Sequence, residues 1–506
     1  MTPRRLGRRP ARVASALAVS IGTAAVAPEV VLGHQLNATY TSRLPLAVYL
    51  TGAAITVGLS FAFVLARDVR ARPATVVAAA HLPPTVLRVA LRAIGLIGWL
   101  WIAAQGIIGG SSAGSVAPLF LWIYGWVGLA IVSAFIGPAW HFLDPFSTLH
   151  DGGARLLRRI GVGSWAAAPY PARLGRWPAC IAFVGFVWIE LVDAGGGVGT
   201  LFVVLMGYTA FTLAMMAQFG RDAWRSHGEV FTVWFRLLGR LAAFALADED
   251  GRVRRRAFAA GLLEPGWSRA DAALAALGVG SILFDGLSQT QIWFDLFGAP
   301  GVGVNTLLLL GWLGLLVGAA MLLTRYVGIE ATGAGLLPIA VGYLIAHYLT
   351  YLVIDGQGIL VAISDPFQRG WDLFGTAFHQ PSGSWLPPGL VWTVQLAAVV
   401  GGHMLGAWAG HVNAAEHAPP GLDARRLTRR EIPLAIVMVA LTTLTLWSLG
   451  QALVVEAPAA SAGSHATALA SVVTAQPPAP PGASGAQPSD ADRDPAGHPL
   501  VERPHV

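Results

Sequence analysis

The sequence contains no lysine and only one cysteine, Cys180, among its 506 residues. Without lysine, the chain has no side chain for Schiff-base or lysine–phosphate chemistry. One cysteine excludes a disulfide bond or a thiolate metal cluster within the chain. Charged residues make up only 12% of the sequence, whereas hydrophobic residues make up 55% and the mean hydropathy is +0.60. This balance predicts an all-α, polytopic membrane protein rather than a soluble one.

Residues 1–33 have the pattern of a secretory signal peptide. Arginines at positions 4, 5, 8, 9 and 12 precede an apolar run over residues 13–27. Cleavage after Gly33 would make His34 the mature N-terminus, where its α-amine and imidazole would chelate one metal ion, copper in particular. The alternative is an uncleaved first helix with His34 as an ordinary surface residue.

Ten further apolar stretches have lengths near that needed to cross a bilayer as helices. They are residues 45–66, 94–108, 118–136, 178–193, 201–219, 272–293, 304–324, 336–354, 390–410 and 433–453. Together they predict a transmembrane helical bundle within a membrane domain of residues 34–453, with the lipid bilayer as its partner.

The arginines predict the orientation of this bundle. The loops on one side hold 24 arginines, whereas the other side holds only Arg43, Arg369, Arg493 and Arg503. By the positive-inside rule the arginine-rich loops are cytoplasmic, so the mature N-terminus and the C-terminal tail lie outside the cell membrane. Because these arginines belong to loops between apolar spans, the net charge of +6 does not indicate a nucleic-acid partner.

Two segments outside the spans have their own character. Residues 220–271 form the longest cytoplasmic loop, and the run VFTVWFRLLGRLAAFA within it places Arg236 and Arg240 opposite an apolar face. This pattern is typical of an amphipathic helix in the inner membrane interface. Residues 454–506 are rich in alanine and proline and predict a disordered tail, to which we assign no function. The sequence identifies no protein partner.

Polar side chains inside the predicted spans are the candidates for chemistry, because ionisable groups in hydrocarbon are functional by default. The pattern is centred on His347, near the middle of its span. Tyr343 and Tyr351 flank it at helical spacing, and Asp355 ends the span. Three other spans add further polar groups: Glu190 and Asp193; Asp285, Ser288 and Gln289; and Gln395 and His403.

The first hypothesis for these groups is a metal site in a cavity open to the outer face. Imidazole and carboxylate ligands suit zinc, cobalt, manganese or iron, with copper at an N-terminal histidine. The candidate metal ligands are His347, His403 and His34. Glu190 and Asp285 are the candidate catalytic groups, as ligands or as the general base for a metal-bound water. The candidate substrate-binding residues are Tyr343, Tyr351, Asp355, Gln289 and Gln395.

The second hypothesis is that each polar group bonds a neighbouring helix and serves packing. Gly402, Gly406 and Gly410 form overlapping small-residue repeats that bring their helix close to a neighbour. In that case His403 serves packing as well. His411, at the cytoplasmic end of the same span, is predicted to be solvated.

Several motifs together resemble a known family. They are GRWPACIAFVGFVWIELV, SILFDGLSQ, AHYLTYLVIDGQG with SDPFQRGWDLFGT, and VQLAAVVGGHMLGAWAGH. They are similar to bacterial integral membrane proteins, common in actinobacteria, that are called fenitrothion hydrolase-like, over residues 34–449. The resemblance implies a secretory leader followed by a histidine, and hydrolysis of an apolar organophosphate triester to a phenol and a dialkyl thiophosphate.

Two function classes therefore stay open. One is a metal-dependent hydrolase of apolar phosphotriesters. The other is a transporter or a metal-handling membrane protein, which broken helices and inverted repeats would favour. Glycine-rich interruptions occur at residues 195–197 and 356–358, but the two halves show no convincing repeat. A purely structural scaffold would leave the clustered ionisable residues unexplained.

Overall fold

The computed structural model describes residues 40–42, 45–66, 79–108, 115–161, 168–193, 195, 198–418 and 424–456. The predicted signal peptide, His34 and residues 457–506 of the predicted tail lie outside these residues, whereas its first three residues, 454–456, form a strand. Within them the chain is almost entirely helical. Four strands of three residues each form two small pairs: β1 (Tyr40–Ser42) pairs in parallel with β4 (Val454–Glu456), and β2 (Phe244–Leu246) pairs antiparallel with β3 (Val253–Arg255).

The helices of the first half include one π-helical stretch, η1, and one 3-10 turn, η2. In chain order they are α1 (Leu46–Ala66), α2 (Thr85–Ile108), α3 (Val116–Pro118), η1 (Leu119–Gly128), α4 (Leu129–Phe135), α5 (Ala139–Leu143), α6 (Pro145–Arg159), η2 (Ala172–Leu174), α7 (Trp177–Leu191) and α8 (Val198–Phe219).

The second half contains the longest helices and two further 3-10 turns, η3 and η4. In chain order they are α9 (Arg221–His227), α10 (Val230–Leu238), η3 (Ala260–Leu263), α11 (Arg269–Ser288), α12 (Gln291–Phe297), α13 (Val302–Val327), α14 (Ile329–Ile354), η4 (Asp355–Gln357), α15 (Gly358–Ser364), α16 (Pro388–Glu416) and α17 (Ala424–Leu453).

Eight helical segments among the described residues are long and apolar enough to cross a membrane. Two shorter apolar helices, α7 and the first part of α1, coincide with the fourth and first predicted spans. An all-α, multi-pass membrane protein is thereby confirmed, whereas the count of ten spans and the orientation remain predictions. The eight segments are Thr85–Ile108, Val116–Phe135, Val198–Phe219, Arg269–Ser288, Val302–Val327, Ile329–Ser364, Pro388–Glu416 and Arg425–Gln451.

Two predicted boundaries that matter for the site were wrong. α11 ends at Ser288 rather than at residue 293, because Thr290 caps a separate helix, α12, by accepting a hydrogen bond from the backbone N–H of Trp293 at 3.3 Å. α14 begins at Ile329 rather than at residue 336, because the small residues before position 336 continue the helix. His347 therefore lies in the last third of its helix rather than near the middle.

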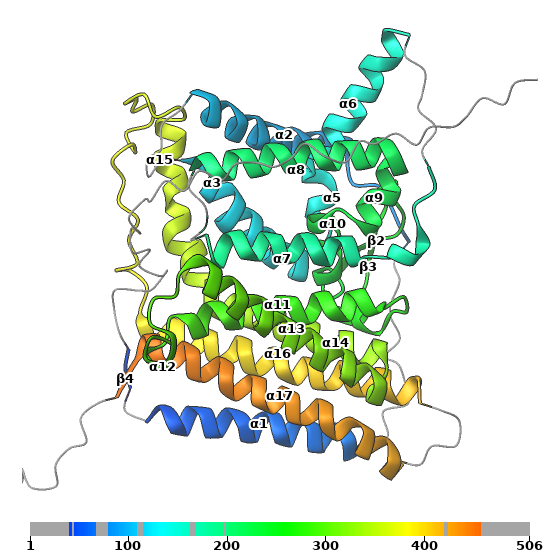
Figure 1. Cartoon of the computed structure of the whole chain (residues 1–506), viewed down its shortest axis with the longest axis vertical. Helices are drawn as coiled ribbons and strands as arrows, with labels where there is room; N and C mark the ends of the chain where they lie inside the picture. Colours follow the sequence, from blue (N-terminus) through cyan, green and yellow to red (C-terminus); the bar gives the residue numbers. More distant parts are fainter. Residues whose placement is uncertain are drawn as a thin grey trace, which may run out of the picture. The chain divides into compact units, whose positions relative to one another are not determined.

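α14 is the central helix of the described chain. Residues 331–344 of this helix are all buried, as expected for a helix that is apolar on every side. It packs against α16, α11, α13 and η1. Figure 1 shows α11, α14, α16, α17 and α1 lying alongside one another, with α9, α10 and the β2–β3 pair gathered at one end of these helices and α12 and α15 at the other.

The predicted amphipathic run in the segment 220–271 forms a helix only over α10, Val230–Leu238. Its apolar side chains are buried in the protein core and do not face lipid at the inner interface. Trp234 stacks on Trp126 of η1, with ring centroids 5.8 Å apart, and also contacts Phe183 of α7 at 5.0 Å. The chain then turns toward β2, so Arg240 does not belong to this helix.

α14 and α16 cross at very short range because glycines occupy the contact on both helices. A Cβ atom at Gly402 would lie 2.6 Å from the carbonyl oxygen of Pro338 and 3.2 Å from the Cα of Gly342. A Cβ atom at Gly406 would lie even closer to the carbonyl oxygen of Gly335. The predicted small-residue repeat on α16 is therefore confirmed as a close helix–helix contact.

Replacing Gly402 with alanine is expected to lower the free energy of unfolding by about 1–3 kcal/mol, because the added methyl group has no space at the crossing. Gly401→Ala is the matched control, since a Cβ at Gly401 meets no atom within 4 Å. Denaturant unfolding of both variants in detergent measures the difference. Equal stability of the two variants would contradict the close crossing.

Candidate functional site

Asp285 on α11 and His347 on α14 form the centre of a polar group between the helices. Nε2 of His347 and Oδ2 of Asp285 are 2.9 Å apart, and the two side chains are only 14% and 12% exposed. The other carboxylate oxygen, Oδ1, accepts a hydrogen bond from Nε2 of Gln289 at 2.8 Å. Asp285 and Gln289 meet because residues four apart lie on the same side of a helix. The predicted polar face of this span is therefore present.

Tyr348 connects a second carboxyl group to this pair. Its hydroxyl oxygen lies 2.8 Å from Oδ2 of Asp285 and 3.3 Å from Oε1 of Glu190 in the last turn of α7. The Tyr348 side chain is 2% exposed and its ring meets the His347 ring edge-on, with centroids 4.6 Å apart. Three helices, α7, α11 and α14, thus contribute to one network that we call the carboxyl network: Glu190, Tyr348, Asp285 and His347.

Glu190 is the least satisfied member of the carboxyl network. The residue as a whole is only partly buried, but its Oε2 atom is buried and has no hydrogen-bond partner among the described residues. A buried carboxylate oxygen without a partner is costly. The position therefore favours the binding of a proton, a cation or an ordered water.

Two of the predicted substrate-binding residues, Tyr343 and Gln395, make contacts between helices beside this network. The Tyr343 hydroxyl and Oγ of Ser448 on α17 are 3.0 Å apart, while the Tyr343 ring meets the His347 ring at 5.8 Å. Nε2 of Gln395 on α16 donates a hydrogen bond to the carbonyl oxygen of Ala346 at 2.8 Å. The ring of Tyr351 lies 6.5 Å from that of Tyr348.

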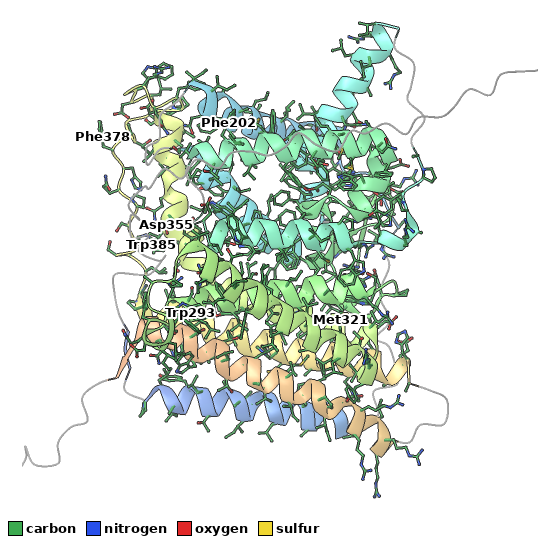
Figure 2. The ribbon with its side chains drawn as sticks, viewed as in Figure 1. Phe202, Trp293, Met321, Asp355, Phe378 and Trp385 are labelled. Carbon is green, nitrogen blue, oxygen red and sulfur yellow. The ribbon has the colours of Figure 1, made fainter. Side chains whose placement is uncertain are left out.

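Asp355, the last of these residues, marks a break in the longest apolar segment. α14 ends just before it, and η4 leads from it into α15. Figure 2 shows Asp355 at this junction, on the same side of the molecule as Trp385. The hydroxyl of Tyr124 on η1 donates a hydrogen bond to the carbonyl oxygen of Gly356 at 2.6 Å, so the break contacts the π-helical stretch.

The structure does not bring His403 to the carboxyl network. Gln395 is level with Ala346, and His403 follows it on α16 by eight residues, roughly 12 Å along a helix axis. Nδ1 of His403 donates to the carbonyl oxygen of Val399 at 2.8 Å, and its buried Nε2 has no hydrogen-bond partner in the described part of the chain. Asp193 lies beyond the end of α7 and does not share a helical face with Glu190.

Within the described residues, no group of three or more histidine, cysteine, aspartate or glutamate side chains is placed to hold a metal ion. His347 and Asp285 contact each other directly, but Glu190 reaches them only through the Tyr348 hydroxyl. His34 lies outside the described residues. The metal site is therefore still a prediction.

Two features of the described chain were not predicted. Tyr348 was missed because the tyrosines were chosen by four-residue spacing, which selects the helical face of His347, whereas α7 approaches from the neighbouring face. Its position directly after an intramembrane histidine was the available signal. His411 was predicted to be solvated, but it is buried and its Nδ1 lies 2.8 Å from Oε2 of Glu431 on α17.

A separate apolar cavity of about 540 Å³ lies beside α2, η1, α5 and α10. Its walls include Trp99, Phe120, Phe231 and Leu352. None of the four members of the carboxyl network lines it. The cavity suits an apolar molecule, but its lining carries no carboxyl group or histidine.

Replacing Tyr348 with phenylalanine is expected to lower the free energy of unfolding by about 1–3 kcal/mol, because Asp285 and Glu190 both lose a buried partner. Tyr326→Phe, at an exposed tyrosine, is the control. In a Glu190→Gln background, the loss of unfolding free energy caused by Tyr348→Phe is expected to differ by about 0.5 kcal/mol or more, because the two side chains are hydrogen-bonded to each other. Fully additive effects in denaturant unfolding would contradict the network.

Comparison of the chain with protein-family models, with curated proteins and with solved structures found no match. The resemblance to fenitrothion hydrolase-like membrane proteins therefore remains a prediction from the sequence motifs.

Proposed function

We propose that this protein is a membrane transporter that couples the movement of a solute to proton binding at the carboxyl network. The observation that carries the proposal is the position of one hydroxyl, that of Tyr348, between the carboxyl groups of Asp285 and Glu190. Chains of carboxylates and histidines inside membrane bundles are typical of proton relays.

The number of hydrogen bonds that the Tyr348 hydroxyl can donate supports one exchangeable proton, carried by Glu190. A tyrosine hydroxyl carries a single proton, so Tyr348 can donate to only one carboxylate at a time. It donates to Asp285 at the shorter distance, 2.8 Å. The 3.3 Å contact with Glu190 is then satisfied when Glu190 carries a proton and donates it to the tyrosine oxygen. That proton also removes the charge from the buried, unpartnered Oε2 of Glu190.

Helix irregularities beside the network support movement. α14 passes through the 3-10 turn η4 into α15, and the neighbouring helix contains the ten-residue π-helical stretch η1. Transporters build their sites from interrupted helices, and π-helical segments are frequent at functional sites. Tyr348 lies seven residues before Asp355, where α14 ends. Rearranging the hydrogen bonds of its hydroxyl would therefore alter α14 near the point where the helix can bend.

The test is proton flux in liposomes that contain the purified protein and a trapped pH dye, with the membrane potential clamped by potassium and valinomycin. An imposed proton gradient is expected to acidify the interior faster than in protein-free liposomes. Glu190→Gln and Asp285→Asn are expected to reduce the rate to the protein-free level. Asp295→Asn, at an exposed carboxyl group on α12 that accepts a hydrogen bond from Gln291, is the matched control. Equal rates in all four proteins would contradict proton movement through the network.

The second candidate is the metal-dependent hydrolase. The observation that favours it is the donor set itself, one imidazole and two carboxyl groups, with Oε2 of Glu190 free of hydrogen bonds to described residues. A modest rotation of Glu190 toward Asp285 and His347 would complete a ligand set of the kind that binds zinc or manganese. The metal would activate a water molecule for attack on phosphorus.

Elemental analysis of the detergent-purified protein separates the two candidates. The hydrolase requires a near-stoichiometric metal that is lost in His347→Ala and kept in His81→Ala, a substitution at an exposed histidine. If the metal is lost in His347→Ala and kept in His81→Ala, phosphotriester turnover is assayed next. No metal after reconstitution with zinc, cobalt, manganese, iron and copper would exclude the hydrolase and leave proton-coupled transport.

A further inference from the structure

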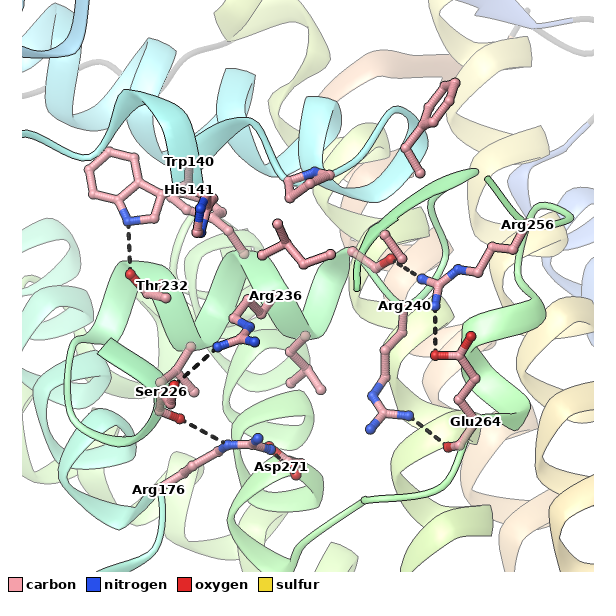
Figure 3. Close-up of a pocket in the computed structure, with 18 residues that line it drawn as sticks. Trp140, His141, Arg176, Ser226, Thr232, Arg236, Arg240, Arg256, Glu264 and Asp271 are labelled. Carbon is pink, nitrogen blue, oxygen red and sulfur yellow. Dashed lines mark hydrogen bonds and ion pairs between the residues drawn. The ribbon is translucent and has the colours of Figure 1, made fainter. Parts of the chain in front are cut away.

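A polar pocket, separate from the apolar cavity described above, lies at the opposite end of the helices from Asp355. It has a volume of about 230 Å³ and is bounded by α5, α9, α10, β2 and the first turn of α11. Four arginines line it, Arg176, Arg236, Arg240 and Arg256, together with only two carboxylates, Glu264 and Asp271. Figure 3 shows these side chains around the pocket, which we call the arginine pocket.

The carboxylates of the arginine pocket are already used. Nη1 of Arg176 donates to both oxygens of Asp271, each at 2.8 Å. Glu264 is shared by two cations, with Arg256 at 2.8 Å and Arg254 at 2.9 Å. Glu249, which does not line the pocket, pairs with Arg236 at 2.8 Å. Five arginines in and beside the pocket therefore face three carboxylates, an excess of positive charge.

Arg240 is the cation that makes no carboxylate contact among the described residues. Its Nη1 donates to the carbonyl oxygens of Gly261 and Glu264 at 3.1 and 2.9 Å, and its Cζ lies 4.2 Å from the centre of the Trp267 ring. These contacts hold the guanidinium group in place, but its Nε–H has no hydrogen-bond partner among the described residues. Burial, only partly opposed by Asp271, lowers the pKa of Arg240 to about 10, so its charge lacks full compensation.

The lowered pKa of His141 reflects the same excess of positive charge. Burial and the charges of Arg225, Arg236 and two further arginines lower the pKa of His141 to about 3. The histidine is therefore neutral at physiological pH. Its Nδ1 lies 3.1 Å from Nη2 of Arg225, which carries only protons to donate, so the histidine proton is on Nε2. His141 thus adds a neutral donor to the wall of the pocket.

We propose that the arginine pocket binds a phosphate group through Arg240 and Arg236. Guanidinium groups match the oxygens of phosphate in pairs, and basic pockets between membrane helices on the cytoplasmic side suit phosphate-bearing head groups. The phosphate belongs either to an anionic phospholipid or to a soluble phosphorylated compound. This binding is independent of the proton chemistry of the carboxyl network.

The experiment titrates the full-length protein in detergent with inorganic phosphate, at constant ionic strength maintained with chloride, by calorimetry. Saturable binding is expected, with affinity about tenfold or more lower in Arg240→Gln and in Arg236→Gln. Arg252→Gln is the control: Arg252 lies in the same segment, is 58% exposed and does not line the pocket. Because Arg236 is 36% exposed and its hydrogen bonds among the described residues go to Ser226 and Glu249, its variant tests the pocket even if Arg240→Gln fails to fold.

A second arm identifies the source of the phosphate. The unfolding midpoint is measured in nanodiscs of phosphatidylglycerol and of phosphatidylcholine. A higher midpoint in phosphatidylglycerol that is lost in Arg236→Gln assigns the pocket to a lipid head group, whereas phosphate binding without this lipid effect assigns it to a soluble compound. The proposal is overturned if neither probe binds, or if the Arg236→Gln and Arg240→Gln proteins bind both probes as the wild type does.

Discussion

A polar side chain inside a bilayer has no water to bond, so its partners must come from the protein itself. This constraint determines the centre of the molecule. His347 and Tyr348 are adjacent on α14, and they reach Asp285 on α11 and, through the tyrosine hydroxyl, Glu190 on α7. Helices separated by long stretches of sequence are thereby held together at one point. Within the carboxyl network, the buried Oε2 of Glu190 is an exception to this rule, and it supports the proposed function.

The close crossing of α14 and α16 fixes the position of this network. Glycines at the contact let the two backbones approach, and the approach places Gln395 where it can bond the carbonyl oxygen of Ala346, next to His347. The carboxyl network thus rests on one side against a rigid helix pair. On its other side are the irregular elements η1 and η4, which bond each other through Tyr124 and Gly356.

The sequence predicted correctly those features that depend on the residue pattern of a single helix. Apolar length predicted the membrane bundle, and the spacing of Asp285 and Gln289 predicted their shared face. It was uninformative where several helices converge, because spacing within α14 cannot tell which neighbour lies on which side. For this reason Tyr348 was overlooked and His403 was grouped with His347. The run at α10 was misplaced because amphipathicity does not distinguish a lipid surface from a protein core.

The burial of α10 has a consequence for biosynthesis. Trp234 packs against both Trp126 of η1 and Phe183 of α7, two elements that are translated earlier and whose rings contact each other with centroids 5.5 Å apart. This aromatic cluster is therefore completed only after the ribosome has produced residues 230–238 and this segment has folded back against them. Until then the first half of the chain lacks part of its aromatic packing, which comes from a nine-residue helix too short to span the bilayer by itself.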